Sequence, residues 1–186
     1  MDFAAAKSGI EAEAPNRPGR THFMDKTLLL PIASMDFLVR QTWLIVSSYR
    51  HWTGKTLWPA DKPDAELVKE VFFAPFVLAS AGTEEDPILN YGNQKALELW
   101  EMDWETFTRT PGRETAEPME RTERARFLET VRRQGYIDHY RGIRVSSRGR
   151  RFEILQATVW NLIDENGRYA GQAVRFEIWT PLGKKT

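Results

Sequence analysis

The sequence predicts an α+β domain, with a five-stranded antiparallel sheet, helices packed on that sheet, and an N-terminal helical extension. Three observations lead to this fold class. Apolar residues recur at helical spacing near the N-terminus, short apolar runs follow in the middle, and three longer strand-like segments close the chain. With 186 residues, 41% of them hydrophobic, the chain has enough apolar material for one well-packed domain.

The N-terminal part divides into a tail and two helices. Residues 1–33 mix Ala, Glu, Pro, Arg and Gly without apolar periodicity, and we expect a flexible tail there. Ser34 is placed to cap a helix that runs to about Trp52. After a loop with two prolines, Asp61 or Asp64 can cap a second helix. These helices form the predicted extension.

Two short strands and a run of helices occupy the middle of the chain. Residues 76–80 and 88–91 are short apolar runs separated by a polar turn, as in paired strands. Asn93 stands where an N-cap is expected, before a helix over 96–100. A charged helix over 118–134 follows, and its nearly balanced charges favour a solvated face with i,i+4 ion pairs.

Three strands close the chain, over residues 136–146, 151–163 and 168–179. In the second of these, alternation assigns one face to Phe152, Ile154, Trp160 and Leu162, and the other to Leu155, Ala157, Val159 and Ile163. Because both faces are apolar, both must be covered. We expect the helices between the second and third strands to cover one face and leave a pocket. The N-terminal helix would cover the other face or pair with a second subunit.

Composition excludes several classes of function. The 26 Lys and Arg balance the 26 Asp and Glu, so we expect no nucleic-acid partner and no docking on anionic membranes. The absence of cysteine excludes disulfides, thiolate metal sites and cysteinyl-flavin adducts. The apolar runs are too short to span a bilayer and no secretory signal is visible, so a cytoplasmic location is expected.

Several short words in the sequence are distinctive. They are Gly82-Thr83, residues 86–93, Ala96-Leu97, Leu99-Trp100, residues 113–118, residues 135–137 and residues 159–162. These words resemble the MEKHLA domain, a family related to PAS domains, and the similarity runs from about residue 48 to residue 179. The resemblance implies a PAS-like sheet and a role in sensing or protein interaction. Family members occur as free-standing bacterial proteins and at the C-terminus of plant homeodomain–leucine zipper regulators.

The sequence patterns and the resemblance together divide the chain into four parts. We expect a flexible tail at 1–33, N-terminal helices at 34–73, a PAS-like domain at 74–180 and a C-terminal tail at 181–186. In PAS domains generally, an asparagine at the place of Asn93 caps the helix after the second strand. We interpret that asparagine as structural.

Large side chains near the short helices are the candidate ligand-binding residues. The candidates are Tyr91, Trp100, Trp104 and Phe107, with Phe127 from the long helix, Trp160 from the sheet, and the amides Asn161 and Gln172. The aromatic members can equally be core residues that pack against each other. The two amides lie in apolar strands, so each needs a hydrogen-bond partner from backbone, water or a ligand.

Metal and cofactor chemistry finds little support. His22, His51 and His139 are far apart and have no companions at metal spacing, so no metal site is predicted. Haem is not expected, because in haem-binding PAS proteins the axial histidine usually lies on the long helix, and residues 118–134 contain no histidine. A non-covalent flavin remains open. Asp138 and His139 suggest acid–base chemistry, but neighbours on a strand point to opposite faces.

Three hypotheses of function follow. The first is a non-catalytic PAS-like sensory module that binds an unknown small molecule or a protein partner and forms a homodimer through its N-terminal helix. The second is a purely structural interaction domain whose interior is filled by its own aromatic side chains. The third is a small enzyme of the cone-shaped α+β type, which requires an open polar pocket with an inward carboxylate or histidine.

Overall fold

The chain is described by a computed structural model over residues 30–31, 33–59 and 61–183, so the predicted tail lies almost wholly outside the described residues. The elements are α1 (Met35–Thr53), α2 (Ala65–Phe72), β1 (Val77–Ala81), β2 (Leu89–Gly92), α3 (Gln94–Trp100), α4 (Trp104–Phe107), 3-10 turns at Gly112–Thr115 and Pro118–Glu120, α5 (Arg121–Gln134), β3 (Tyr136–Val145), β4 (Arg151–Ile163), β5 (Tyr169–Phe176) and β6 (Ile178–Leu182).

The helix caps follow the local sequence closely. The Ser34 hydroxyl accepts a hydrogen bond from the Phe37 backbone N–H at 3.2 Å, and Gly54 ends α1 in the left-handed region at φ 68°. Of the two aspartates proposed for α2, Asp64 is the cap and accepts from the Leu67 N–H at 2.9 Å. These contacts involve only near neighbours in the chain, which is why the sequence predicts them.

Asn93 has a wider role than a cap. Its side-chain oxygen accepts from the Ala96 N–H at 3.1 Å, the capping bond, and also from the Leu78 N–H at 3.0 Å. Its amide donates to the Phe76 carbonyl at 2.7 Å. These bonds join the start of β1 to the start of α3. Asn93 is fully buried, and its side-chain polar atoms are all paired, as buried polar groups need to be.

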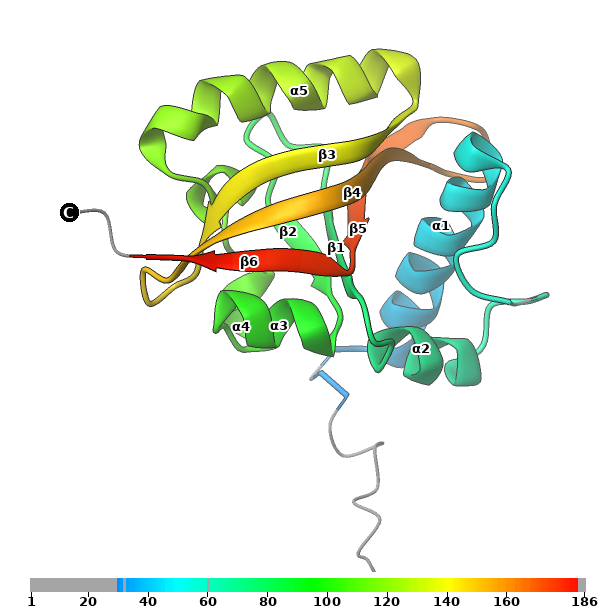
Figure 1. Cartoon of the computed structure of the whole chain (residues 1–186). Helices are drawn as coiled ribbons and strands as arrows, with labels where there is room; N and C mark the ends of the chain where they lie inside the picture. The colour runs from blue at the N-terminus through cyan, green and yellow to red at the C-terminus, as the bar shows by residue number, and fades with distance from the viewer. Residues whose placement is uncertain (1–29, 32, 60, 184–186) are drawn as a thin grey trace, which may run out of the picture.

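The sheet is antiparallel, with strand order β2-β1-β5-β4-β3 and β6 paired with the first half of β4 (Figure 1). It therefore has six strands, where five were expected. The predicted last strand is divided at Glu177, since β1 pairs with β5 only as far as Phe176. Pro181, which was expected to lie in the C-terminal tail, instead pairs with Phe152 inside β6.

Helices cover both faces of this sheet (Figure 1). The first, which we call the α1 face, is covered by α1 and α2 over the core residues Leu38, Ile45, Tyr49, Leu78, Trp160 and Leu162. The second, which we call the cavity face, lies under α3, α4 and α5, with the core residues Val77, Ala79, Trp100, Phe107, Phe152 and Ile154. The prediction that the N-terminal helix covers one face of the sheet, and the helices between β2 and β3 cover the other, is confirmed.

The assignment of side chains to the two faces of β4 was wrong in part. Phe152 and Ile154 lie on the cavity face, whereas Trp160 and Leu162 lie on the α1 face. A bulge separates them: Tyr140 pairs with Ala157 and Gly142 with Ile154, so two residues of β4 oppose one of β3. Gln156 in that bulge has φ 52°. One extra residue reverses the alternation for the rest of the strand.

Candidate ligand-binding site

A cavity of about 80 Å³ lies on the cavity face, between the sheet and the helices that precede β3. Most of its wall is apolar, and β1, α5 and β5 contribute more of the lining residues than the other elements do. Its lining residues include Ala79, Leu89, Trp100, Phe107, Phe127, Leu128, Ile154, Val159 and Val174. Pockets for drug-sized ligands measure about 300 Å³ or more, so this one suits only small compounds in the conformation described.

Two arginines bring positive charge into this wall. Arg144 of β3 is only 7% exposed and donates to the Tyr140 hydroxyl at 2.7 Å and to the Ile143 carbonyl at 2.8 Å. Arg124 of α5 lies beside Gly112, where an added Cβ would be 2.9 Å from its Nη2 atom. The Nε–H of Arg124 is buried and has no hydrogen-bond partner in the described part of the chain. This N–H is therefore free to donate a hydrogen bond.

The electrostatic balance of this wall is uneven. No Asp or Glu is among the residues that line the cavity. The pKa of Arg124 is lowered to about 10, mainly by burial and also by the positive charge of Arg144, while Tyr140 opposes part of the fall. The guanidinium stays protonated at neutral pH, so the cavity wall carries positive charge that no lining carboxylate balances.

A second cavity, of about 180 Å³, lies on the outer side of the same arginines. It shares Arg124, Phe127, Tyr140 and Arg144 with the inner cavity, and Glu120 and Glu123 line it as well. The rings of Phe127 and Tyr140 are stacked, with centroids 4.0 Å apart. The arginines and this aromatic pair therefore stand between an apolar inner cavity and a polar outer one.

The structure brings together only some of the predicted ligand-binding residues. Trp100, Phe107, Phe127 and Gln172 line the inner cavity. Tyr91 and Trp160 are fully buried in the α1 face, and Trp104 packs against Tyr91 with ring centroids 5.9 Å apart. Because the sheet separates the two groups, the eight residues cannot form one site. Trp160 lies on the α1 face because the bulge in β4 reverses the alternation of side chains along that strand.

The α1 face holds a buried pair of hydroxyls. Burial raises the pKa of Tyr91 well above its ordinary value, and the Thr42 hydroxyl opposes part of that rise. Neither hydroxyl has a partner in hydrogen-bonding geometry among the described residues. Trp160 is better satisfied, since its indole N–H donates to the Ile45 carbonyl at 3.3 Å and its ring packs edge-on against Tyr49. These aromatic residues are core residues.

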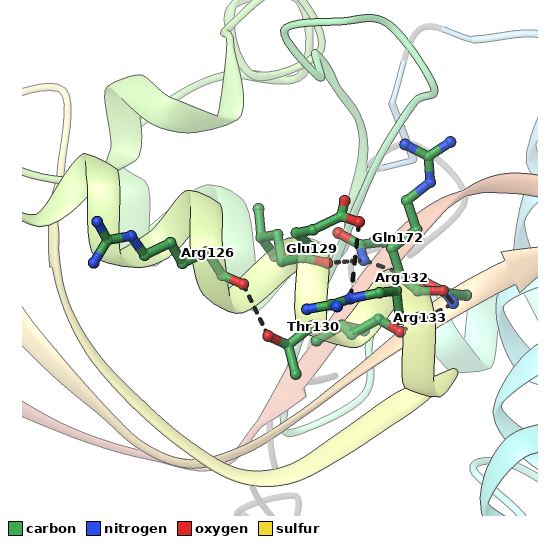
Figure 2. Close-up of polar contacts among 9 residues, drawn as sticks. Arg126, Glu129, Thr130, Arg132, Arg133 and Gln172 are labelled. Atoms are coloured by element: carbon green, nitrogen blue, oxygen red, sulfur yellow. Dashed lines mark hydrogen bonds and ion pairs between the residues drawn. The ribbon is translucent and has the colours of Figure 1, made fainter.

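The two predicted amides hold α5 on the sheet. Asn161 donates to the carbonyls of Val131 and Arg132 at 3.1 and 3.0 Å. Gln172 donates to the Leu128 carbonyl at 3.0 Å, and to the Asn161 side-chain oxygen at 3.1 Å (Figure 2). Both amides thus find backbone partners, and Asn161 is not among the residues that line the cavity. The network ties the C-terminal half of α5 to β4 and β5.

The same place in the fold connects the two faces. The Asn161 backbone carbonyl accepts from the indole N–H of Trp52, in α1, at 2.9 Å. Gly135, which ends α5 at φ 95°, lies against the Trp52 ring so closely that an added Cβ would overlap it. We call Trp52, Gly135 and Asn161 the junction. It joins the last turn of α1 to the end of the helix that covers the cavity.

The acid–base hypothesis finds no site among the described residues. Asp138 accepts from the Thr158 hydroxyl at 2.6 Å and pairs with Lys55 at 3.7 Å. His139 is exposed in a second bulge of β3, at φ 61°. Neither residue lines the inner cavity. No cluster of three His, Asp or Glu able to hold a metal occurs in the described part of the chain, and no helix there could cross a membrane.

Sequence reasoning missed both arginines. The charged helix was interpreted as a solvated face, yet Arg124 is three residues before Phe127 and seven before Val131, which puts it on the apolar side of α5. That spacing was a usable signal. Arg144 carried none, because polar and apolar residues alternate in β3 and either face can be wet.

Comparison with known proteins identifies relatives of the sequence. The model of a family described as the MEKHLA domain matches residues 39–181. The homeobox-leucine zipper protein ATHB-9 of Arabidopsis thaliana is 28% identical over 127 residues, which is 66% of this chain and 15% of that protein. The chain therefore corresponds to a small part of that relative.

Solved structures match the fold. A PAS domain of a protein from Colwellia psychrerythraea has a TM-score of 0.52 at 15% identity, covering 61% of this chain and 94% of that chain. The light-state dimer of the fungal blue-light photoreceptor Vivid has a TM-score of 0.53 at 15% identity, covering 80% of this chain and 97% of that chain. At such identities the match establishes the fold alone, and that fold is PAS-like.

Proposed function

The chain belongs to the MEKHLA domain family, and from that premise we propose that it is a non-catalytic sensory module whose inner cavity takes a small ligand. The observation that carries the proposal is the arrangement of α5. This helix lines the cavity through Phe127 and Leu128, and its end is bound to α1 at the junction. A ligand that moves α5 would therefore change the packing of α1.

The lining of the cavity supports binding over catalysis. Among the described residues that line it there is no histidine, aspartate or glutamate, the commonest general bases, although Tyr140 and Tyr169 are present. A purely structural domain would fill this space with its own side chains, as the α1 face does with Trp160 and Tyr91. The unfilled volume and the buried Nε–H of Arg124, which has no partner in the described part of the chain, favour a ligand site.

The experiment starts with native mass spectrometry and a metabolite screen by thermal shift. We expect a small mass that is released on denaturation, or a compound that raises Tm. Ala79→Leu, which fills the cavity from β1, should abolish that binding while the variant stays folded by circular dichroism. Equal binding by wild type and Ala79→Leu would place the ligand elsewhere and refute the proposal.

Transmission is tested separately. Ligand binding should change amide hydrogen exchange in the last turns of α1, near Trp52. Trp52→Phe removes the indole N–H that donates to Asn161 and keeps an aromatic ring. We expect this variant to bind ligand as the wild type does, with a smaller exchange response in α1. An unchanged response would show that the junction does not transmit.

We also propose that the module forms a homodimer through the outer side of α1. Partly buried Trp43 of α1 lies there with Leu57 and Trp58 around a groove of about 280 Å³. Vivid is described as a dimer in its light state. Light scattering on the wild type and on Trp43→Glu is the test, and a monomeric wild type at high concentration would refute this assembly.

A further inference from the structure

We propose that the inner cavity binds a small organic monoanion, a carboxylate with a short apolar tail, whose carboxylate lies between Arg124 and Arg144. This inference rests on the proposed function and deepens it, since it names the class of ligand for the same cavity. Three properties of the cavity lead to it: its charge, its shape and the position of its acidic neighbours.

The positive charge of the cavity wall favours an anionic ligand. Two guanidinium groups line the cavity and no carboxylate does. Arg144 uses some of its donors on Tyr140 and Ile143, but the buried Nε–H of Arg124 donates to nothing in the described part of the chain. A buried N–H of a charged group that finds no acceptor is costly in a folded protein. A carboxylate would accept from both arginines and relieve the repulsion between them.

The small volume and apolar wall of the inner cavity favour a ligand with a short apolar tail. Beyond the arginines, the inner cavity is walled by side chains such as Leu89, Phe107, Ile154 and Val159. An apolar cavity of about 150 Å³ can hold benzene, so a cavity of about half that volume suits three or four carbon atoms. A fully solvated ion such as phosphate would gain nothing from this wall, whereas the tail of a short carboxylic acid would.

The glutamates beside the arginines favour a ligand that carries one negative charge over one that carries two. Glu120 and Glu123 line the outer cavity only, and neither forms an ion pair with Arg124 or Arg144 in the described structure. Arg141, also in the outer cavity, is already paired with Glu153 at 2.8 Å. A second carboxylate on the ligand would have to lie near Glu120 and Glu123 or in the apolar part. Either position disfavours a dianion.

The probes are butyrate, its uncharged analogue butyramide, and the dianion succinate, added to the full chain at constant ionic strength. We expect butyrate to raise Tm and to bind in calorimetric titration. Butyramide should bind at least tenfold more weakly, because it offers no charge to the two arginines. Succinate should also bind more weakly than butyrate.

Arg124→Met is the decisive variant, since it keeps length and apolar contact and removes the charge. Its affinity for butyrate should fall at least tenfold, while Tm without ligand stays equal or rises. Arg126→Met is the matched control, because Arg126 is on the same helix and exposed. It should bind butyrate as the wild type does. Should Arg124→Met fail to fold, Arg144→Met provides the same comparison.

The outcomes separate this inference from the proposed function. Equal binding of butyrate and butyramide, unaffected by Arg124→Met but abolished by Ala79→Leu, would refute the ligand class and leave the cavity as a ligand site. An equal loss in Arg124→Met and Arg126→Met would indicate surface ion binding and refute the inference. Failure of butyrate to bind refutes it as well, and the metabolite screen with Ala79→Leu then decides the proposed function by itself.

Discussion

The two faces of the sheet are built from similar apolar residues but are packed differently. On the α1 face, large side chains such as Trp160 and Tyr91 are fully buried against α1 and its neighbours. On the cavity face, α5 stands over a space of about 80 Å³ into which Arg124 and Arg144 bring unbalanced charge. The difference shows that one sheet can be closely packed on one face and leave an unfilled, positively charged space on the other.

The largest expected effect tests the α1 face as the stabilising side. Trp160→Ala should lower the free energy of unfolding by about 3–5 kcal/mol, because it removes a fully buried indole and leaves a cavity. Chemical denaturation measures the loss. Ile178→Ala, at a side chain that is 48% exposed, is the control and should change stability by about 0.5 kcal/mol or less. Similar losses in both variants would break the comparison.

The next effect concerns the network that joins the faces. Asn161→Ala should cost about 2 kcal/mol, because the Arg132 carbonyl loses the donor that Asn161 supplies and the Val131 carbonyl keeps only the Gly135 N–H. Gln172→Ala should cost less, about 1 kcal/mol, since Gln172 is only partly buried. Denaturation curves, together with hydrogen exchange of α5, measure both changes. A larger loss for Gln172→Ala than for Asn161→Ala would contradict the network described.

A matched pair of enlargements compares the packing directly. Val71→Ile adds one methylene to a fully buried position under the α1 face and should cost about 1–2 kcal/mol. Val159→Ile adds the same group beside the cavity and should cost about 0.5 kcal/mol or less, because empty volume receives it. Thermal unfolding of both variants is the measurement. Equal costs would mean that the cavity face is packed as tightly as the other.

The smallest effect at neutral pH belongs to Tyr91. Tyr91→Phe should change stability by less than about 0.5 kcal/mol at pH 7, because the buried hydroxyl has no hydrogen-bond partner to lose. The folded-state pKa of Tyr91 is raised, so above its ordinary value of 10.0 the unfolded chain releases a proton that the folded chain keeps. Wild-type stability then falls by about 1.4 kcal/mol per pH unit from this group.

The pH dependence gives that variant its test. The difference in unfolding free energy between wild type and Tyr91→Phe should be flat below about pH 9 and should grow in favour of the variant above about pH 10. Urea denaturation over this range measures it. Parallel profiles for the two proteins would show that Tyr91 is not held protonated in the α1 face.

Much of the fold was available from the sequence, and its errors are informative. The caps Ser34, Asp64 and Asn93 were predicted because a cap is a contact between neighbours in the chain. The bulge at Gln156 was not predicted, since nothing local distinguishes it from a regular strand position. That one residue moved Trp160 to the α1 face, away from the predicted ligand-binding residues that line the cavity.

The sequence by itself determined the fold class, the order of the elements and the family, because these depend on periodicity, on capping residues and on words such as residues 86–93. The tertiary structure alone decided which side chains meet. It turned Arg124 under α5 beside Arg144, and it satisfied Asn161 and Gln172 with helix carbonyls. The physical reason is that a site consists of residues far apart in the chain, whose meeting depends on register and on packing across the sheet.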